Sequence, residues 1–215
     1  MFDQHFKDIY IDLLSMPNKI NFWHYKFISM LLCYGKSPIH LHLGCGQKYH
    51  EGFINIDTNI FRKKDIWLDV RKCLPFKEDS VDSIYSHSLF EHFYPKELLY
   101  LLKECYRVLR LGCGMRVAVP NLEVAINGYA IHDLSWVSDF PKPFASLGGK
   151  FYNFIFCDGQ HKMCFDFGLL EEILGQAGFR DIAETKAQKS SIYADERLKE
   201  QGPDYAHLYL ECFKR

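Results

Sequence analysis

A short apolar run that ends in two glycines constrains this chain most. It reads Ile39-His-Leu-His-Leu-Gly-Cys-Gly46, and a second strand-like run, Gly52-Phe-Ile-Asn-Ile-Asp57, follows it closely. Apolar residues alternate in the first run and stop abruptly at Gly44, which predicts a buried strand followed by a loop. Because glycine has no Cβ, such a loop lets the backbone lie close to a ligand. We therefore expect a small-molecule site at the carboxyl end of a parallel strand.

The spacing of these two runs argues against the commonest nucleotide-binding fingerprint. A dinucleotide loop reads G-x-G-x-x-G, opens a full helix and has its acidic residue about 20 residues further on. Here Tyr49 occupies the third glycine position, and Asp57 follows Gly44 by only 13 positions (57 − 44). This leaves room for a turn or a stub of helix, so a pyrophosphate would lose its usual helix N-terminus. S-adenosylmethionine, which has an adenosine but no phosphate, fits better: Gly44 and Gly46 admit its methionine part, and Asp57 can accept both ribose hydroxyls.

Further blocks along the chain resemble one family, the class I S-adenosylmethionine-dependent methyltransferases. The resemblance is closest to a small bacterial, type 11-like branch with an LHLGCG loop, a shortened first helix and a GFINID second strand. The blocks that carry it occur in the family's order between residues 39 and 120: 41–46, 52–57, 69–76, 80–87, 89–92 and 109–115. A single G-x-G would be weak evidence, but these blocks in this order are strong evidence.

The resemblance implies a fold and an activity. The fold is α/β, a Rossmann-like doubly wound sheet, mostly parallel with an antiparallel last strand and a shortened first helix. We expect an N-terminal helical extension over residues 1–35 and a methyltransferase domain over 36–215, with a substrate cap within about 121–165. The activity is methyl transfer from S-adenosylmethionine, with S-adenosylhomocysteine as product, to an oxygen or nitrogen of a sugar or secondary metabolite. The alternatives are an NAD-dependent oxidoreductase and a noncatalytic regulatory module that binds S-adenosylmethionine.

Composition narrows the partners and the compartment. The net charge is −1, so the sequence lacks the excess of basic charge that favours binding to nucleic acid or to a membrane surface. The eight cysteines form no C-x-x-C pair, which indicates reduced thiols in a cytoplasmic protein. We see neither a signal peptide nor an apolar run of about 18 to 20 residues. A small-molecule substrate is therefore the expected partner, and a homodimer remains open.

The remaining secondary structure follows from periodicity and from capping residues. A helix beginning at Pro95 is expected to end at Gly112, and another is expected between Asp166 and Gly178. The other expected helices cover residues 2–14, 21–32 and 195–200, and the other expected strands cover 65–69, 81–86, 115–119, 179–185 and 205–213. Residues 121–160 show the least regular pattern.

Cofactor-binding residues are expected at the carboxyl ends of the strands. The resemblance implies that Asp69 and Val70 lie near the adenine and that His92 shapes the cofactor pocket. The loop after the first strand, the acid that ends the second strand and the tip of the fourth strand supply the other candidates. The full set of expected cofactor-binding residues is Gly44, Cys45, Gly46, Asp57, Asp69, Val70, Ser86, His87 and His92.

Three histidines compete for a catalytic role. A hydroxyl acceptor must lose its proton during methyl transfer, and His, Asp or Lys usually supplies the base. His87 lies at a strand tip, whereas His161 follows the irregular stretch, where Asp158 could orient its imidazole and Lys162 could discourage its protonation. We predict His161 and His87 as catalytic, ahead of His92. His40 and His42 alternate with leucines on a buried strand and are expected to be structural. No spacing of His, Cys and carboxylates predicts a metal site.

Overall fold

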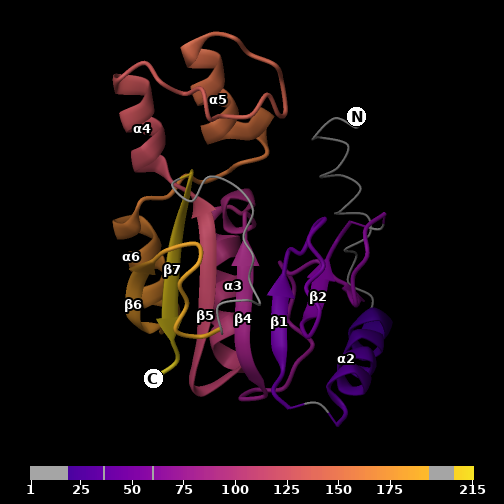
Figure 1. Ribbon diagram of the computed structural model, residues 1–215. Coiled ribbons are helices and arrows are strands. Elements are labelled where there is room, and N and C mark those ends of the chain that lie inside the picture. Colours follow the sequence, from indigo (N-terminus) through magenta and orange to yellow (C-terminus); the bar gives the residue numbers. More distant parts are fainter. Residues whose placement is uncertain (1–18, 36, 60, 194–205) are drawn as a thin grey trace.

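The computed structural model describes residues 19–35, 37–59, 61–193 and 206–215 (Figure 1). The helices expected over residues 2–14 and 195–200 lie outside the described residues. Helix α2, Lys19–Cys33, covers the second expected helix. No helix in the described part of the chain is long and apolar enough to cross a membrane.

In the described part of the chain, seven strands form one sheet in the order β3-β2-β1-β4-β5-β7-β6. The strands are β1 His40–Leu43, β2 Ile54–Asp57, β3 Ile66–Trp67, β4 Val81–His87, β5 Leu109–Pro120, β6 Arg180–Thr185 and β7 His207–Phe213. Among the strands of the described residues, β7 alone runs opposite to the other six, so it pairs antiparallel with both β5 and β6. The expected Rossmann-like, mostly parallel sheet with an antiparallel last strand is confirmed. Its strand order reverses between β1 and β4, the switch point where open α/β sheets bind ligands.

The first helix is absent rather than shortened. Residues 44–53, all of them described, form turns between β1 and β2 without a helix. Three glycines in this stretch, Gly44, Gly46 and Gly52, have positive φ angles, and these interrupt any right-handed helical turn. The expectation of a helical stub was wrong, and the alternative of a turn was right.

The three longest helices of the described residues pack on the same face of the sheet. Helix α3, Pro95–Val108, helix α6, Phe167–Ala177, and α2 all contact one apolar core that includes Leu41, Leu43 and Ile84. On the opposite face the described residues provide loops instead of helices. There Phe53 and Tyr193 cover Tyr85 of β4.

Capping chemistry placed α6 correctly but misplaced the end of α3. The Asp166 carboxylate accepts the Leu169 N–H at 2.8 Å, and Gly178 ends α6 at φ +109°. Helix α3 ends at Val108 instead of near Gly112, because the next residue already pairs with Val81 of β4. Strand β5 is therefore longer than the predicted run 115–119.

The expected cap region, residues 121–165, contains two helices. Helix α4 spans Leu122–Ala130 and helix α5 spans Leu147–Phe156, followed by the short helix η2, Cys157–Gly159. Both α4 and α5 stand beyond the carboxyl ends of β4 and β5 (Figure 1). Their N-caps are a side-chain oxygen of Asn121 and one of Ser146. The insertion thus lies at the end of the sheet where a ligand is expected.

Candidate functional site

Two glycines shape the loop after β1. Gly44 and Gly46 have φ angles of +67° and +51°, which other residues adopt only with strain. A Cβ on Gly44 would also lie 2.7 Å from the Leu89 side chain. The N–H groups of Gly44 and Cys45 donate to the Ile56 carbonyl at 2.9 and 3.2 Å. Burial raises the pKa of Cys45 to about 12, so its thiol is a packing group and not a nucleophile.

Asp57 ends β2 and joins this loop. Its Oδ2 accepts the Gly46 N–H at 2.7 Å, and its Oδ1 accepts the Asn59 N–H at 2.6 Å. Its side chain remains partly exposed. Each carboxylate oxygen offers two lone-pair directions, so both can accept a further donor. The structure therefore brings together the glycine loop and the acid that the sequence predicted as partners.

Asp69 is engaged by an arginine that the sequence analysis did not consider. The Arg71 guanidinium donates to both oxygens of the Asp69 carboxylate at 3.0 to 3.1 Å, and the Arg71 N–H also donates to Oδ1 at 3.0 Å. The Val70 side chain is buried in the core. Asp69 and Val70 can thus offer a cofactor their backbone groups. The Asp69 carboxylate is also available, but it already forms a charge-assisted ion pair with Arg71.

The tip of β4 carries two buried polar groups. Among the described residues, neither the Ser86 hydroxyl nor His87 Nε2 has a hydrogen-bond partner. His87 Nδ1 and His207 Nε2 both contact the Ser88 hydroxyl, at 3.0 and 3.1 Å. Burial, with His207 as the next cause, lowers the pKa of His87 to about 2. His87 is therefore a neutral and very weak base.

Further histidines line the helix-free face of the sheet. His42 is almost completely buried, and its Nδ1 lies 3.1 Å from the Asn55 amide oxygen. Burial lowers the pKa of His42 to about 3 and that of His207 to about 4. His40 contacts the Ser83 hydroxyl at 2.6 Å. Both His40 and His42 thus lie within the sheet packing, as expected of structural residues.

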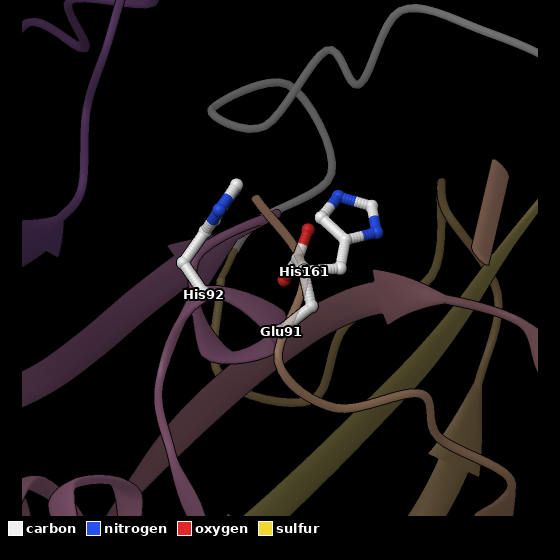
Figure 2. Close-up of side chains that lie close together, drawn as sticks. All are labelled: Glu91, His92 and His161. Atoms are coloured by element: carbon white, nitrogen blue, oxygen red, sulfur yellow. The ribbon is translucent and has the colours of Figure 1, made fainter. Parts of the chain in front are cut away.

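Three titratable side chains converge next to the cap (Figure 2). Glu91 and His92 belong to the short helix η1, Phe90–His92, and His161 follows η2. One potential ligand atom from each of the three lies within 4.8 Å of the others. Burial raises the pKa of Glu91 to about 8. Burial, helped by the charge on His92, lowers the pKa of His161 to about 4.

The neighbours of His161 differ from the prediction. Asp158 does not orient its imidazole, because the Asp158 carboxylate pairs with Lys142 at 2.6 Å. Lys162 donates to the Gly159 carbonyl at 2.6 Å, and burial and His92, not Lys162, lower the pKa of the imidazole. His161 Nδ1 instead contacts the Ile155 carbonyl oxygen at 3.1 Å.

Sequence reasoning missed Glu91, Arg71 and His207. Glu91 had one visible signal, an acid between apolar residues in Leu89-Phe-Glu-His92. Such a residue is rarely buried without a specific reason. Arg71 lies only two positions after Asp69, so this ion pair was within reach of the sequence, but it was not considered. His207 carried no signal, because its contact with Ser88 joins chain segments that only the fold brings together.

Comparisons with known proteins agree on one kind of domain. Residues 48–115 match the family model described as "Methyltransferase domain". No curated protein sequence matches the chain. An S-adenosylmethionine-dependent methyltransferase from Archaeoglobus fulgidus superposes with a TM-score of 0.53 and 16% identity, over 99% of this chain and 100% of that one.

Two further solved structures are similar. A possible histamine N-methyltransferase from Thermotoga maritima has a TM-score of 0.52 and 17% identity, over 91% of this chain and 90% of that one. An S-adenosylmethionine-dependent methyltransferase from Methanosarcina mazei has a TM-score of 0.50 and 15% identity, over 86% and 96%. At such identities the structural likeness establishes the fold.

Proposed function

We propose that this chain is a class I S-adenosylmethionine-dependent methyltransferase that methylates an oxygen or nitrogen of a small-molecule acceptor. Its fold and the family match over residues 48–115 support the assignment to this class. S-adenosylmethionine is its cofactor. The observation that carries the acceptor side of the proposal is the convergence of Glu91, His92 and His161 beside the cap. An enzyme that methylates a hydroxyl group needs a proton acceptor at such a place.

The cofactor side of the proposal rests on residues at the switch point. Gly44, Cys45 and Gly46 would hold the methionine part against the backbone, and Asp57 would accept the ribose hydroxyls. The absence of a helix between β1 and β2 suits a ligand without a pyrophosphate. The remaining proposed cofactor contacts are Asp69, Val70, Ser86, His87 and His92.

His161 is the proposed contact to the reacting group of the acceptor. Its side chain is partly exposed, and its lowered pKa keeps the imidazole neutral and able to accept a hydroxyl proton. It would hold the acceptor against the methyl group, and most of the catalytic effect would come from this positioning and from the exclusion of water. The much lower pKa of His87 makes it the weaker candidate for this step.

Exposed aromatic side chains on the cap support a small, partly apolar acceptor. Phe144, Tyr152 and Phe156 are 36%, 37% and 50% exposed, and their rings form a contiguous group. Such rings stack on the apolar faces of sugars and of aromatic metabolites. We therefore propose a sugar or secondary metabolite as acceptor. We place the reaction in the cytoplasm, because the eight cysteines are free thiols.

The alternatives have less support. An NAD-dependent oxidoreductase would need a phosphate-binding helix after β1, and residues 44–53 form turns only. A noncatalytic module would not need proton-accepting side chains beside the cap. Neither alternative is favoured by an observation of its own.

The test is a screen for S-adenosylhomocysteine production. The purified chain is incubated with S-adenosylmethionine and with pools of metabolites and nucleotide sugars, and the Asp57→Ala variant serves as the cofactor-deficient control. We expect a pool that yields methylated product with the wild-type chain only. A chain that binds S-adenosylhomocysteine but methylates nothing in these pools would contradict the proposed acceptor class. A chain that binds no S-adenosylhomocysteine would contradict the whole assignment.

A further inference from the structure

We propose that Glu91, His92 and His161 form a binding site for a divalent transition-metal ion, with Zn²⁺ as the ion to test. The inference builds on the proposed function, because the cluster lies where that function places the acceptor. The binding itself requires neither S-adenosylmethionine nor an acceptor, so it can be tested separately.

The geometry of the three side chains is close to that of a metal centre. Their ligand atoms lie within 4.8 Å of one another, and the Glu91 carboxylate lies between the two imidazoles in Figure 2. Ligands at about 2.0 to 2.2 Å from a tetrahedral zinc ion are about 3.4 Å apart. Small side-chain rotations would therefore close the site.

Both histidines already have the outer contacts that metal-binding histidines usually make. His92 Nδ1 lies 3.2 Å from the Gln160 carbonyl oxygen, and His161 Nδ1 lies 3.1 Å from that of Ile155. A carbonyl oxygen only accepts, so each Nδ1 carries the hydrogen and each Nε2 keeps its lone pair. Such a second contact fixes the tautomer and the ring orientation of a metal ligand.

An independent observation is the buried carboxyl group of Glu91. The side chain is 1% exposed, and among the described residues its Oε2 has no hydrogen-bond partner. A buried polar atom without a partner is costly and rare. A cation bound to this oxygen would satisfy it.

Main-chain hydrogen bonds hold the two segments of the cluster together. The Glu91 carbonyl accepts the N–H groups of Lys162 and Met163 at 2.7 and 3.2 Å, and the His161 N–H donates to the Phe156 carbonyl at 3.2 Å. Phe90 anchors η1 in the core, fully buried. The ligands thus project from a fixed frame, which limits the reorganisation that binding would require.

The donor set selects the kind of ion. Two imidazoles and one carboxylate are typical of catalytic zinc and of non-haem iron(II), whereas magnesium and calcium prefer oxygen ligands. Three protein ligands also leave a coordination position open. With the ion bound, the His161 Nε2 lone pair would bind the metal and could not accept a proton; a hydroxyl acceptor at the open position would instead have its pKa lowered by the ion.

The experiment measures metal binding by the full chain and by four single variants. Glu91→Gln, His92→Gln and His161→Gln each remove one ligand with little change in shape. His132→Asn is the matched control, because His132 is an exposed cap histidine with φ +59°, and asparagine tolerates this conformation. Metal content after desalting, Zn²⁺ affinity by calorimetry and thermal stability with and without Zn²⁺ are recorded. The absorption of the Co²⁺-substituted protein separates nitrogen and oxygen ligands from the eight free thiols.

We expect one Zn²⁺ per wild-type chain and a Co²⁺ spectrum without thiolate charge transfer. Each ligand variant should bind Zn²⁺ at least about 100-fold more weakly. This exceeds the loss of about 10- to 100-fold in metal affinity that is typical when an outer contact of a ligand is removed. His132→Asn should bind as the wild type does. Absence of stoichiometric binding, thiolate bands in the Co²⁺ spectrum, or equal affinity in wild type and folded Glu91→Gln would overturn the proposal. Methyl transfer that persists in metal-free protein would then leave the proposed function standing.

Discussion

The backbone N–H of Gly46 donates a 2.7 Å hydrogen bond to the Asp57 carboxylate. This contact connects the loop after β1 to the end of β2. The same carboxylate also accepts the Asn59 N–H, so Asp57 organises two backbone segments while it keeps lone pairs for a ligand. Loss of its side chain should therefore affect both the loop and the cofactor.

We expect Asp57→Ala to weaken the binding of S-adenosylhomocysteine by about 2 to 4 kcal/mol, because it removes two charge-assisted hydrogen bonds. Titration calorimetry on the folded variant measures this. Asp139→Ala is the control, since the Asp139 side chain is 73% exposed on the cap. Equal affinities of wild type and Asp57→Ala would place the ribose elsewhere.

The chain should discriminate between S-adenosylhomocysteine and NAD. The turn at residues 44–53 gives a pyrophosphate no helix N-terminus, so we expect micromolar affinity for S-adenosylhomocysteine and no measurable affinity for NAD. Calorimetry with both ligands on the same preparation decides this. Tighter binding of NAD would contradict the role assigned to the glycine loop.

Replacement of His161 separates a catalytic role from a structural one. We expect His161→Ala to lower turnover about 10²-fold or more, with little change in the affinity for S-adenosylhomocysteine. If the imidazole has only a structural role, as a hydrogen-bond donor to the Ile155 carbonyl, the melting temperature of the variant should fall while its turnover per folded molecule is retained. Near-normal turnover would move the catalytic role to His87.

A buried ion pair should dominate the stability of the helix-free face. The fully buried Arg116 guanidinium donates to Glu211 at 3.1 Å and to the carbonyls of Lys186, Ala187 and Lys189 at 2.8 to 2.9 Å. Arg116→Met would leave a buried carboxylate without its cation, so we expect a loss of about 3 to 5 kcal/mol in the free energy of unfolding.

Urea unfolding measures this loss. The control is Arg215→Met, which breaks the exposed pair with Asp181 and should cost at most about 1 kcal/mol. Replacing Arg116 and Glu211 together by apolar residues should cost less than Arg116→Met alone. Equal losses in the two arginine variants would show that the network contributes little.

Three buried or half-buried histidines predict a loss of stability in mild acid. His42, His87 and His207 have pKa values of about 3, 2 and 4 in the folded chain, against about 6.5 in the unfolded chain. As the pH falls below 6.5 the unfolded chain takes up protons first, so stability is complete above this value and declines below it. Each histidine should cost up to about 1.3 kcal/mol between pH 7 and pH 5.5.

The variant His42→Gln tests this account of the pH dependence. It removes one titrating group but keeps a donor for Asn55, so its loss of stability between pH 7 and pH 5.5 should be smaller by about 1.3 kcal/mol. Urea unfolding at the two pH values measures the difference. An unchanged pH dependence would mean that the buried histidines do not control acid stability.

Local patterns were sufficient for the strands, the glycine loop and the caps of α6. Alternating or continuous apolar residues mark β1, β2 and β4, because burial on a pleated strand requires side chains of that kind. Asp166 and Gly178 mark the two ends of α6, because capping depends only on adjacent backbone groups. The cofactor class also followed from a local distance, the short step from Gly44 to Asp57.

Contacts between distant segments decided the rest. Pairing with Val81 ended α3 earlier than its own sequence indicated, and Lys142 paired with the carboxylate that had been expected to orient His161. Glu91 and His161 belong to different segments and meet only because main-chain hydrogen bonds join η1 to the chain after η2. Periodicity and capping report on neighbours along the chain, whereas burial, pKa and ligand geometry depend on neighbours in space. For that reason the sequence by itself determined the sheet and the cofactor loop, and only the tertiary structure assembled the cluster beside the cap.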